Sequence, residues 1–257
     1  MPARFFRLFM HVTSLFFVSE FFFAVQGIVC AVGLLASFFF FGHAGLLGYV
    51  VVGTVAANIQ VLKVATFGSG PLEMVQGTLV FCSLFWCFDM IVEFFGAHKA
   101  YRALYVSMTS SVLMTGWMLT TMWMSTVPYN MHVQRAFEVL FTPAPGIFAA
   151  SLLAYFLSQS LDVYVFSALR SWTRGRFLWF RGLFSTAVAS FLDHLVFSWL
   201  AWRVFTTQPL ALPLFWHTYI LTGYGLRLAL SFGSPCMLYA AYAVYPYCAW
   251  AEEKRRI

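Results

Sequence analysis

The sequence predicts an all-α membrane protein, a polytopic helical bundle with about seven transmembrane segments. Composition is the first observation behind this prediction, because 61% of the 257 residues are apolar and only 9% are charged. Soluble domains carry about 25% charged residues, and a chain this apolar would expose large hydrophobic patches to water. The second observation is that several apolar runs reach the roughly 20 residues that a helix needs to cross a bilayer. Runs of this length favour helices over a barrel, whose strands alternate polar and apolar residues over about 10 positions.

Seven apolar segments follow one another along the chain, separated by short connections rich in Gly and Pro. They lie at about 18–41, 45–65, 72–95, 101–126, 145–168, 180–202 and 212–246. The last segment is long enough to be kinked, and Pro235 is the expected cause. We expect one transmembrane domain over residues 1–257, in which an N-terminal extra helix at about 18–41 precedes a six-helix core at about 45–246. The first apolar stretch is too long for a cleaved signal peptide.

The fifteen Lys and Arg residues are shared unequally between the two sides of this arrangement. One side holds nine of them: Lys99, Arg102, Arg170, Arg174, Arg176, Arg181, Lys254, Arg255 and Arg256. The other holds five: Arg4, Arg7, Lys63, Arg135 and Arg203, while Arg227 lies inside a span. Because cytoplasmic loops carry the excess of Lys and Arg, we expect a cytoplasmic C-terminus and an external N-terminus. This distribution also accounts for the net charge of +6 without a nucleic-acid-binding domain.

Several classes of functional site have no counterpart in the sequence. There is no G-x-x-x-x-G-K-[S/T] loop for ATP, and the six histidines show no metal-ligand spacing. The five cysteines are an odd number without metal-ligand spacing, so we interpret them as packing residues rather than as a disulfide framework. We therefore expect no metal, no cofactor, no catalytic residues and no enzymatic activity.

Acidic residues inside the apolar segments are the main candidates for a functional site. Asp162 and Asp193 lie deep in their segments, whereas Asp89 and Glu93 lie closer to the end of theirs. An Asp at the centre of a spanning helix costs about 2.5–3.5 kcal/mol on insertion, so such residues usually face the interior of the bundle and serve a function. The alternative is that they hold helices together as hydrogen-bonding groups or as a buried ion pair. Arg227, the one cation deep in a late segment, is the expected partner of a carboxylate.

The spacing of these residues places them on common helix faces. Asp89 and Glu93 are four positions apart, so both carboxylates lie on one face of their helix. Ser158, Gln159 and Asp162 share a face through the i, i+3 and i+4 relations. Two polar residues, Asn58 and Gln60, end the second segment.

Four blocks of residues run in order from about Gly45 to Tyr239. The first is Gly45-Leu46-Leu47-Gly48-Tyr49 with Asn58-Ile59-Gln60-Val61-Leu62-Lys63, and the second is Asp89, Glu93 and Gly96 in the pattern D-x-x-x-E-x-x-G. The third is Ala154-Tyr155 with Ser158-Gln159-x-x-Asp162-Val163 and Phe166. The fourth is Leu178-Trp179-x-Arg181 with Ser185-Thr186 and Asp193-x-x-x-Phe197. In these blocks the chain resembles the queuosine precursor transporter family, also called the vitamin uptake transporter family. It departs from the family at Phe88, Ser190 and His194 around the acidic residues, and carries Arg227 where the family tends to have Lys.

The resemblance implies import of a queuosine precursor, a 7-deazaguanine such as preQ0 or preQ1, or the base queuine, across the bacterial cytoplasmic (inner) membrane for tRNA queuosine salvage. A carboxylate is a natural acceptor for two N–H donors of a guanine-like edge, and flat bases stack on aromatic rings. We expect a central cavity lined by the residues Asp89, Glu93, Gln159, Asp162 and Asp193, with Asn58 and Gln60 closing one end and Arg227 as a charge partner. Replacing Asp162 or Asp193 by Asn is then expected to abolish uptake and to leave the protein folded.

Other interpretations of the sequence stay open. The chain suits a substrate-binding subunit of an ATP-driven vitamin or nucleobase uptake system, because it has no ATPase of its own. An intramembrane enzyme that uses paired carboxylates, or a structural membrane protein, are the other classes. The expected partners are the lipid bilayer and a small molecule, and the sequence leaves open whether the protein forms a homodimer.

Overall fold

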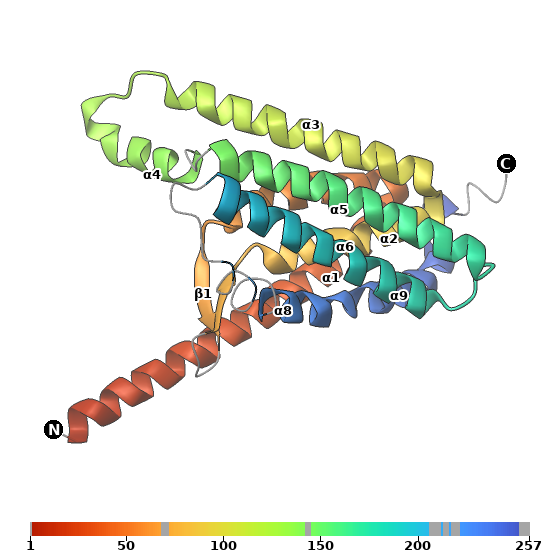
Figure 1. Cartoon of the computed structure of the whole chain (residues 1–257), viewed down its shortest axis with the longest axis horizontal. Coiled ribbons are helices and arrows are strands. Elements are labelled where there is room, and N and C mark those ends of the chain that lie inside the picture. Colours follow the sequence, from red (N-terminus) through yellow and green to blue (C-terminus); the bar gives the residue numbers. More distant parts are fainter. Residues whose placement is uncertain are drawn as a thin grey trace.

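The computed structural model is a bundle of long helices, and it describes residues 2–67, 72–141, 145–205, 212, 216 and 222–251. Figure 1 shows α3, α5 and α6 lying side by side along the length of the bundle, with α2 behind them and α9 along one edge. The predicted fold class, a polytopic helical bundle, is confirmed.

The first helix, α1 (Pro2–Gln60), is two antiparallel helices joined at Gly42. The backbone of Gly42 has φ 57° and ψ −127°, a conformation that glycine adopts without the steric penalty of a Cβ. The chain reverses there, and the side chain of Gln26 donates a hydrogen bond of 2.9 Å to that of Gln60 across the two halves. Trp250 covers the turn so closely that a Cβ on Gly42 would lie 2.8 Å from its ring. The predicted boundary between the first two segments is therefore confirmed.

Four further long helices form the body of the bundle. They are α2 (Thr78–Phe95), α3 (Ala97–Met122), α5 (Pro145–Trp172) and α6 (Leu178–Trp199). The central one is α2, because fifteen of its eighteen residues are buried and it packs against α1, α3, α5 and α9. The acidic residues of α2 therefore lie inside the protein and not against lipid, as the cost of a charge in hydrocarbon requires.

The last predicted segment is broken into two helices, α8 (Thr222–Ser231) and α9 (Gly233–Val244). The break follows from Pro235, which has no N–H to donate to the carbonyl of Ser231 one turn earlier. The predicted kink is thus present. A π-helical turn, η2 (Leu200–Val204), continues α6, and a 3₁₀ turn, η4 (Tyr245–Tyr247), follows α9. The first part of the predicted segment 212–246 includes residues 213–215 and 217–221, which lie outside the described residues.

The structure corrects the sequence prediction between α1 and α2 and after α3. Helices were expected at 45–65 and 72–95, but α1 ends at Gln60 and α2 begins at Thr78. Two strands lie between them, β1 (Val64–Phe67) and β2 (Leu72–Val75), which pair antiparallel. In β1 the β-branched residues Val64 and Thr66 alternate with other types, a pattern that favours a strand over a helix. The short helix α4 (Met131–Phe141), preceded by the turn η1 (Pro128–Asn130), was also not predicted.

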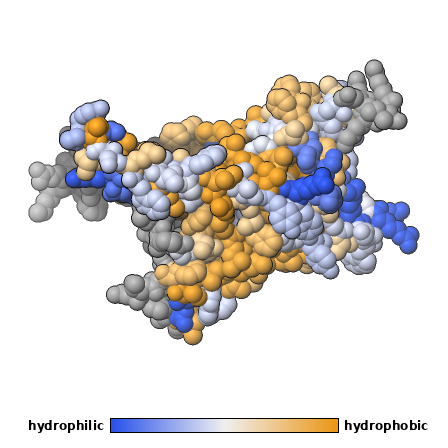
Figure 2. Space-filling view, turned by 90° about the horizontal axis from the view of Figure 1, so that it is seen from above, coloured by the Kyte–Doolittle hydropathy of each residue, from blue (hydrophilic) through white to orange (hydrophobic). Residues whose placement is uncertain are grey.

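The surface of the bundle is suited to lipid. Figure 2 shows hydrophobic surface across the middle of the molecule and hydrophilic surface toward both ends. Large apolar side chains point outward, among them Phe21, Phe22, Phe40 and Trp117, each more than 60% exposed. Four stretches are long and apolar enough to cross a membrane: Ser19–Gln60, Thr78–Phe95, Phe148–Trp172 and Gly223–Tyr247. Since the first of these is doubled back at Gly42, the chain is a multi-pass membrane protein, and the number of seven spans remains a prediction.

Candidate functional site

Polar side chains are buried on the inward faces of the helices that form the bundle. They include Thr54, Ser83, Asp89, Glu93, Ser107, Ser111, Ser158, Gln159, Asp162, Arg181, Ser185, Thr186, Ser190, Asp193 and Ser234. We call the end of the bundle with the turns at Gly42, Gly96 and Gly175 the basic end, because Lys99, Arg102, Arg170, Arg174, Arg176 and Arg181 lie near it. The opposite end, where α1 reaches Asn58, is called the Asn58 end.

Glu93 forms an ion-pair cluster at the basic end. Its Oε2 lies 3.2 Å from the guanidinium of Arg181 and 3.5 Å from that of Arg170. The hydroxyl of Tyr242 donates a further hydrogen bond of 2.6 Å to Glu93. Arg181 is 1% exposed and its guanidinium lies 5.2 Å from the ring centre of Phe166, an arrangement that offsets the cost of burying the charge. Glu93 therefore ties α2 to α5, α6 and α9.

One turn further into the bundle, Asp89 is held by hydroxyl groups instead of cations. Ser185 and Thr186 of α6 donate hydrogen bonds of 3.2 Å and 3.1 Å to its two oxygens, and Ser234 of α9 donates a third. The last contact depends on close packing of α6 on α9, because a Cβ on Gly182 would lie 2.8 Å from the Ser234 hydroxyl. Asp89 is thus a buried carboxylate with its hydrogen-bonding capacity largely used by the protein.

Asp193 lies on α6, toward the Asn58 end, and is paired with the one cation of α8. Its Oδ2 contacts the guanidinium of Arg227, and its Oδ1 accepts a 3.4 Å hydrogen bond from Ser158 of α5. The other side of Arg227 faces the ring of Phe81, 5.7 Å from its centre. Because each charge of a buried pair compensates the other, this pair fixes α6 against α8.

Gln159 and Asp162, on α5, differ from Asp89, Glu93 and Asp193 in their hydrogen bonding. Both side chains are 0% exposed. None of their four polar side-chain atoms makes a hydrogen bond of normal length to a described residue, although the Ser185 hydroxyl, which donates to Asp89, also lies near Asp162. Asp162 lies close enough to Asp89 for the two carboxylates to repel each other. Leaving a buried polar group unsatisfied costs about 1–3 kcal/mol, and more when the group is charged. Native proteins bond nearly all of their buried polar groups to protein or to water, so these two side chains are candidates for binding a polar ligand.

A hydroxyl cluster separates these two residues from the Asn58 end. The hydroxyl of Tyr155, four residues before Gln159 on α5, lies 2.8 Å from the Ser107 hydroxyl of α3. Thr54 of α1 also reaches the Tyr155 hydroxyl, at 3.3 Å. Tyr155 is 2% exposed, so its ring and these three hydroxyls close the interior of the bundle at this level.

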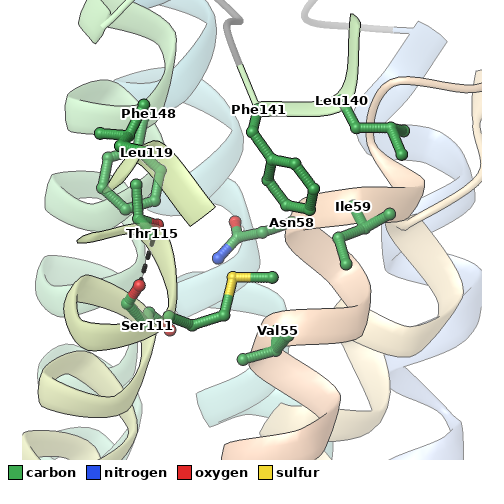
Figure 3. A pocket seen from close by; sticks show the side chains of 10 residues that line it. Val55, Asn58, Ile59, Ser111, Thr115, Leu119, Leu140, Phe141 and Phe148 are labelled. Atoms are coloured by element: carbon green, nitrogen blue, oxygen red, sulfur yellow. Dashed lines mark hydrogen bonds between the residues drawn. The ribbon is translucent and has the colours of Figure 1, made fainter. Parts of the chain in front are cut away.

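Beyond Tyr155, at the Asn58 end, the structure has a cavity of about 180 Å³. We call it the Asn58 cavity, and it is lined by Val55, Asn58, Ile59, Ser111, Met114, Thr115, Leu119, Leu140, Phe141 and Phe148. Figure 3 shows the Asn58 amide pointing across the cavity toward the helix that carries Ser111 and Thr115. Ser151 of α5 donates a hydrogen bond of 2.9 Å to the oxygen of this amide.

The candidate residues from the sequence therefore fall into separate groups. Asp89, Glu93, Gln159, Asp162 and Asp193 are all buried in the core. Asn58 lines a different cavity, and Gln60 bonds to Gln26 within α1. Among the described residues, no three His, Cys, Asp or Glu side chains converge as metal ligands would.

Sequence reasoning missed the residues that distinguish one carboxylate from another. Arg170, Tyr242 and Ser234 were not among the predicted site residues, although they contact Glu93 or Asp89. Ser185 and Thr186 stood in one of the four sequence blocks, so their place eight and seven residues before Asp193 was a usable signal. Nothing in the sequence marked Tyr242, because it is one of twelve tyrosines in an apolar chain.

Comparison with known proteins adds a family to this geometry. Residues 76–241 match the family described as "Putative vitamin uptake transporter". The chain is also 31% identical over 208 residues to a Bacillus subtilis (strain 168) protein named "Probable queuosine precursor transporter". That alignment covers 80% of this chain and 87% of the relative. No solved structure matches the chain.

The matched region runs from two residues before α2 through most of α9, so it contains Asp89, Glu93, Asp162 and Asp193 and most of their neighbours, but not Tyr242. The family is one of transporters, not of enzymes. The chain belongs to the vitamin uptake transporter family.

Proposed function

We propose that this protein imports a queuosine precursor, a 7-deazaguanine such as preQ0 or preQ1 or the base queuine, across the bacterial cytoplasmic membrane. The family and the function named for the Bacillus subtilis relative support this function. The observation that carries the proposal is the pair Gln159 and Asp162, fully buried and without a hydrogen bond of normal length to a described residue.

The chemistry of this pair suits the edge of a guanine-like base. The carboxylate of Asp162 accepts two N–H donors at once, as charge-assisted hydrogen bonds. The amide of Gln159, three residues earlier on the same helix face, offers both a donor and an acceptor. A bound base would form hydrogen bonds with these groups and so recover the cost of burying them. Selectivity follows, because an analogue lacking the N–H groups leaves the carboxylate unpaired.

The other carboxylates serve different purposes in this proposal. Glu93 and Asp193 each hold an arginine, one toward the basic end and one toward the Asn58 end. Asp89 is occupied by hydroxyls and lies beside Asp162, where it holds α6 against α2. Movement of the site between the two faces would then require one ion pair to separate while the other holds.

The orientation follows from the basic end. The turns after Gly96 and Trp172 bring Lys99, Arg102, Arg174 and Arg176 to this end, and an excess of Lys and Arg marks the cytoplasmic side. We therefore propose that the basic end and the C-terminus face the cytoplasm, and that the Asn58 cavity faces outward.

Uptake of labelled preQ0, preQ1 and queuine, one at a time, tests the function. The cells should be unable to make or import these compounds, and queuosine in tRNA reports that the imported compound is used. Asp162→Asn is expected to lose uptake, whereas Glu138→Gln, the same chemical change on exposed α4, is expected to retain it. Uptake by purified protein in liposomes separates a self-sufficient transporter from a subunit that needs an ATP-driven partner. Equal uptake by Asp162→Asn and the unchanged protein would contradict the assignment of the site.

A further inference from the structure

We infer that the Asn58 cavity is a second binding site for the transported base, an entry vestibule that Tyr155 separates from Gln159 and Asp162. This inference rests on the proposed function. It is carried by three features of the Asn58 end: the size of the cavity, an unpartnered hydroxyl in its wall, and a line of polar residues that leads inward from it.

The cavity has the dimensions and the lining of a site for a small flat ring. Its volume of about 180 Å³ somewhat exceeds the roughly 150 Å³ of an apolar cavity known to bind benzene. Most of its wall is apolar, with Phe141 and Phe148 as the aromatic members. Aromatic and aliphatic walls with a few placed polar groups are the usual lining of a small-molecule site.

The polar groups in the wall are available to a ligand. Ser111 is 1% exposed, and its hydroxyl has no hydrogen-bond partner among the described residues. The Asn58 amide points across the cavity in Figure 3, and its oxygen accepts a hydrogen bond from Ser151. An amide N–H and a hydroxyl on opposite walls can bond to the edge of one heterocyclic base.

The polar residues around the cavity continue inward at intervals of one helical turn. On α1, Asn58 is followed four residues deeper by Thr54; on α3, Ser111 is followed by Ser107; on α5, Ser151 is followed by Tyr155 and then Gln159. Residues four apart share a helix face, so three helices direct polar groups along one path. The path runs from the cavity, through the Tyr155 hydroxyl cluster, to the unpartnered amide and carboxylate.

Tyr155 is the barrier on this path. Its hydroxyl is held by Ser107 at 2.8 Å and Thr54 at 3.3 Å, and its ring packs edge-on against Phe81 with 5.8 Å between ring centres. Passage of a base requires the ring to turn away and these hydrogen bonds to open. The same ring then offers a face on which the base can stack.

Thiol labelling tests the vestibule separately from transport. Cys236 is replaced by Ser because its thiol is exposed and would react with maleimide. The other four cysteines are buried and can stay: Cys30, Cys82, Cys87 and Cys248. A Thr115→Cys variant reports on the cavity, and a Ser125→Cys variant reports on the same end of α3 outside it. We expect preQ0 or preQ1 to slow maleimide labelling of the Thr115→Cys variant at least fivefold and to leave the Ser125→Cys variant unaffected. The slowing should persist when Asp162→Asn is added, because the vestibule does not need the central site.

The results distinguish the vestibule from the proposed function, because uptake is measured on the same variants. Slowing that vanishes with Asp162→Asn, or no slowing in a variant that still imports the base, would overturn the vestibule and leave the function intact. Slowing without uptake would support the vestibule and count against transport.

The barrier is tested by labelling of a Gln159→Cys variant. Tyr155→Phe, which keeps the ring and removes the hydroxyl, is expected to speed this labelling severalfold without changing that of the Thr115→Cys variant. Ser107→Ala removes the hydrogen bond between Ser107 and Tyr155 without changing the tyrosine. It should also speed the labelling, and it provides a second test if Tyr155→Phe does not fold. Unchanged labelling in both variants would contradict a hydroxyl-held barrier.

Discussion

Asp89, Asp162 and Asp193 are all buried, yet each has a different set of neighbours. Hydroxyls surround Asp89 and a guanidinium faces Asp193. Asp162 has the Ser185 hydroxyl near it but no hydrogen bond of normal length to a described residue. Replacing Asp by Asn therefore has different energetic consequences. At Asp162 it removes a buried carboxylate that has no ion-pair partner, which relieves a cost. At Asp193 it leaves the partner, Arg227, as a buried charge without compensation, which adds a cost. The same isosteric change from Asp to Asn therefore separates a ligand-binding carboxylate from a structural one.

Asp162→Asn is expected to reduce uptake by about 10–100-fold, which corresponds to the loss of a hydrogen bond to a charged group worth about 1.5–3 kcal/mol. The midpoint of thermal unfolding in detergent should stay the same or rise, because no hydrogen bond of normal length to the protein is lost. Uptake and unfolding are measured on the same purified preparation. A clear fall in the unfolding midpoint would show that Asp162 is a structural residue.

Asp193→Asn is expected to destabilise the protein by about 3–5 kcal/mol, because it leaves the charge of Arg227 buried without compensation. This prediction differs from the expectation drawn from the sequence alone, in which replacing either aspartate by Asn leaves the protein folded. The double variant Asp193→Asn/Arg227→Met removes both charges and should regain much of the lost stability. A double-mutant cycle measures the coupling, and additive effects would argue against a stabilising pair.

At the scale of secondary-structure elements, the tight turn at Gly42 and the break before Pro235 shape the bundle. The turn makes one continuous apolar stretch into two antiparallel helices. The break between α8 and α9 lets Arg227 face Asp193 while Ser234 reaches Asp89. Both are places where backbone chemistry overrides the preference of an apolar segment for one straight helix.

Gly42→Ala is expected to destabilise the protein by about 1–3 kcal/mol, the cost of a strained backbone, with a further cost from the contact with Trp250. Gly48→Ala is the matched control, since it lies in the same helix with no atom within 4 Å of an added Cβ. It should be neutral or slightly stabilising. Unfolding midpoints of the two variants decide the matter, and equal values would show that the turn tolerates a side chain.

At the scale of the whole molecule, buried polar residues inside the bundle and an apolar surface around it form one membrane-spanning body whose two ends differ. The basic end holds the Glu93 cluster and the docked Trp250, whose indole N–H donates to the Phe38 carbonyl at 2.9 Å. The Asn58 end holds a cavity beneath α4. The buried ion pairs Glu93–Arg181 and Asp193–Arg227 lie toward opposite ends of the bundle interior.

The proposed orientation predicts which end is reached from outside. In a Cys236→Ser background, Ser125→Cys at the Asn58 end should react with a membrane-impermeant maleimide in intact spheroplasts. Ser171→Cys at the basic end should react only after the membrane is permeabilised, because Lys and Arg retain that end in the cytoplasm. The reverse pattern would show that the protein is inserted the other way round.

The sequence by itself determined that this protein is a membrane bundle and that its acidic residues lie inside, because lipid excludes both charge and unpaired backbone. It also located the turn after the first segment and the kink near Pro235. It did not reveal the β1–β2 hairpin or α4, which are short and lie outside the long apolar runs. In this chain hydropathy is nearly uniform around the helices, so periodicity does not define which face turns inward.

Only the tertiary structure decided what each acidic residue contacts. Ser234 bonds to Asp89 across 145 positions of sequence, and Tyr242 bonds to Glu93 across 149. Such contacts depend on the rotation and depth of each helix against its neighbours, which packing sets. For the same reason the sequence grouped Asn58 and Gln60 with the central residues, whereas the packing of α1, α3 and α5 places Asn58 in a cavity of its own and leaves Gln159 and Asp162 as the unpartnered pair.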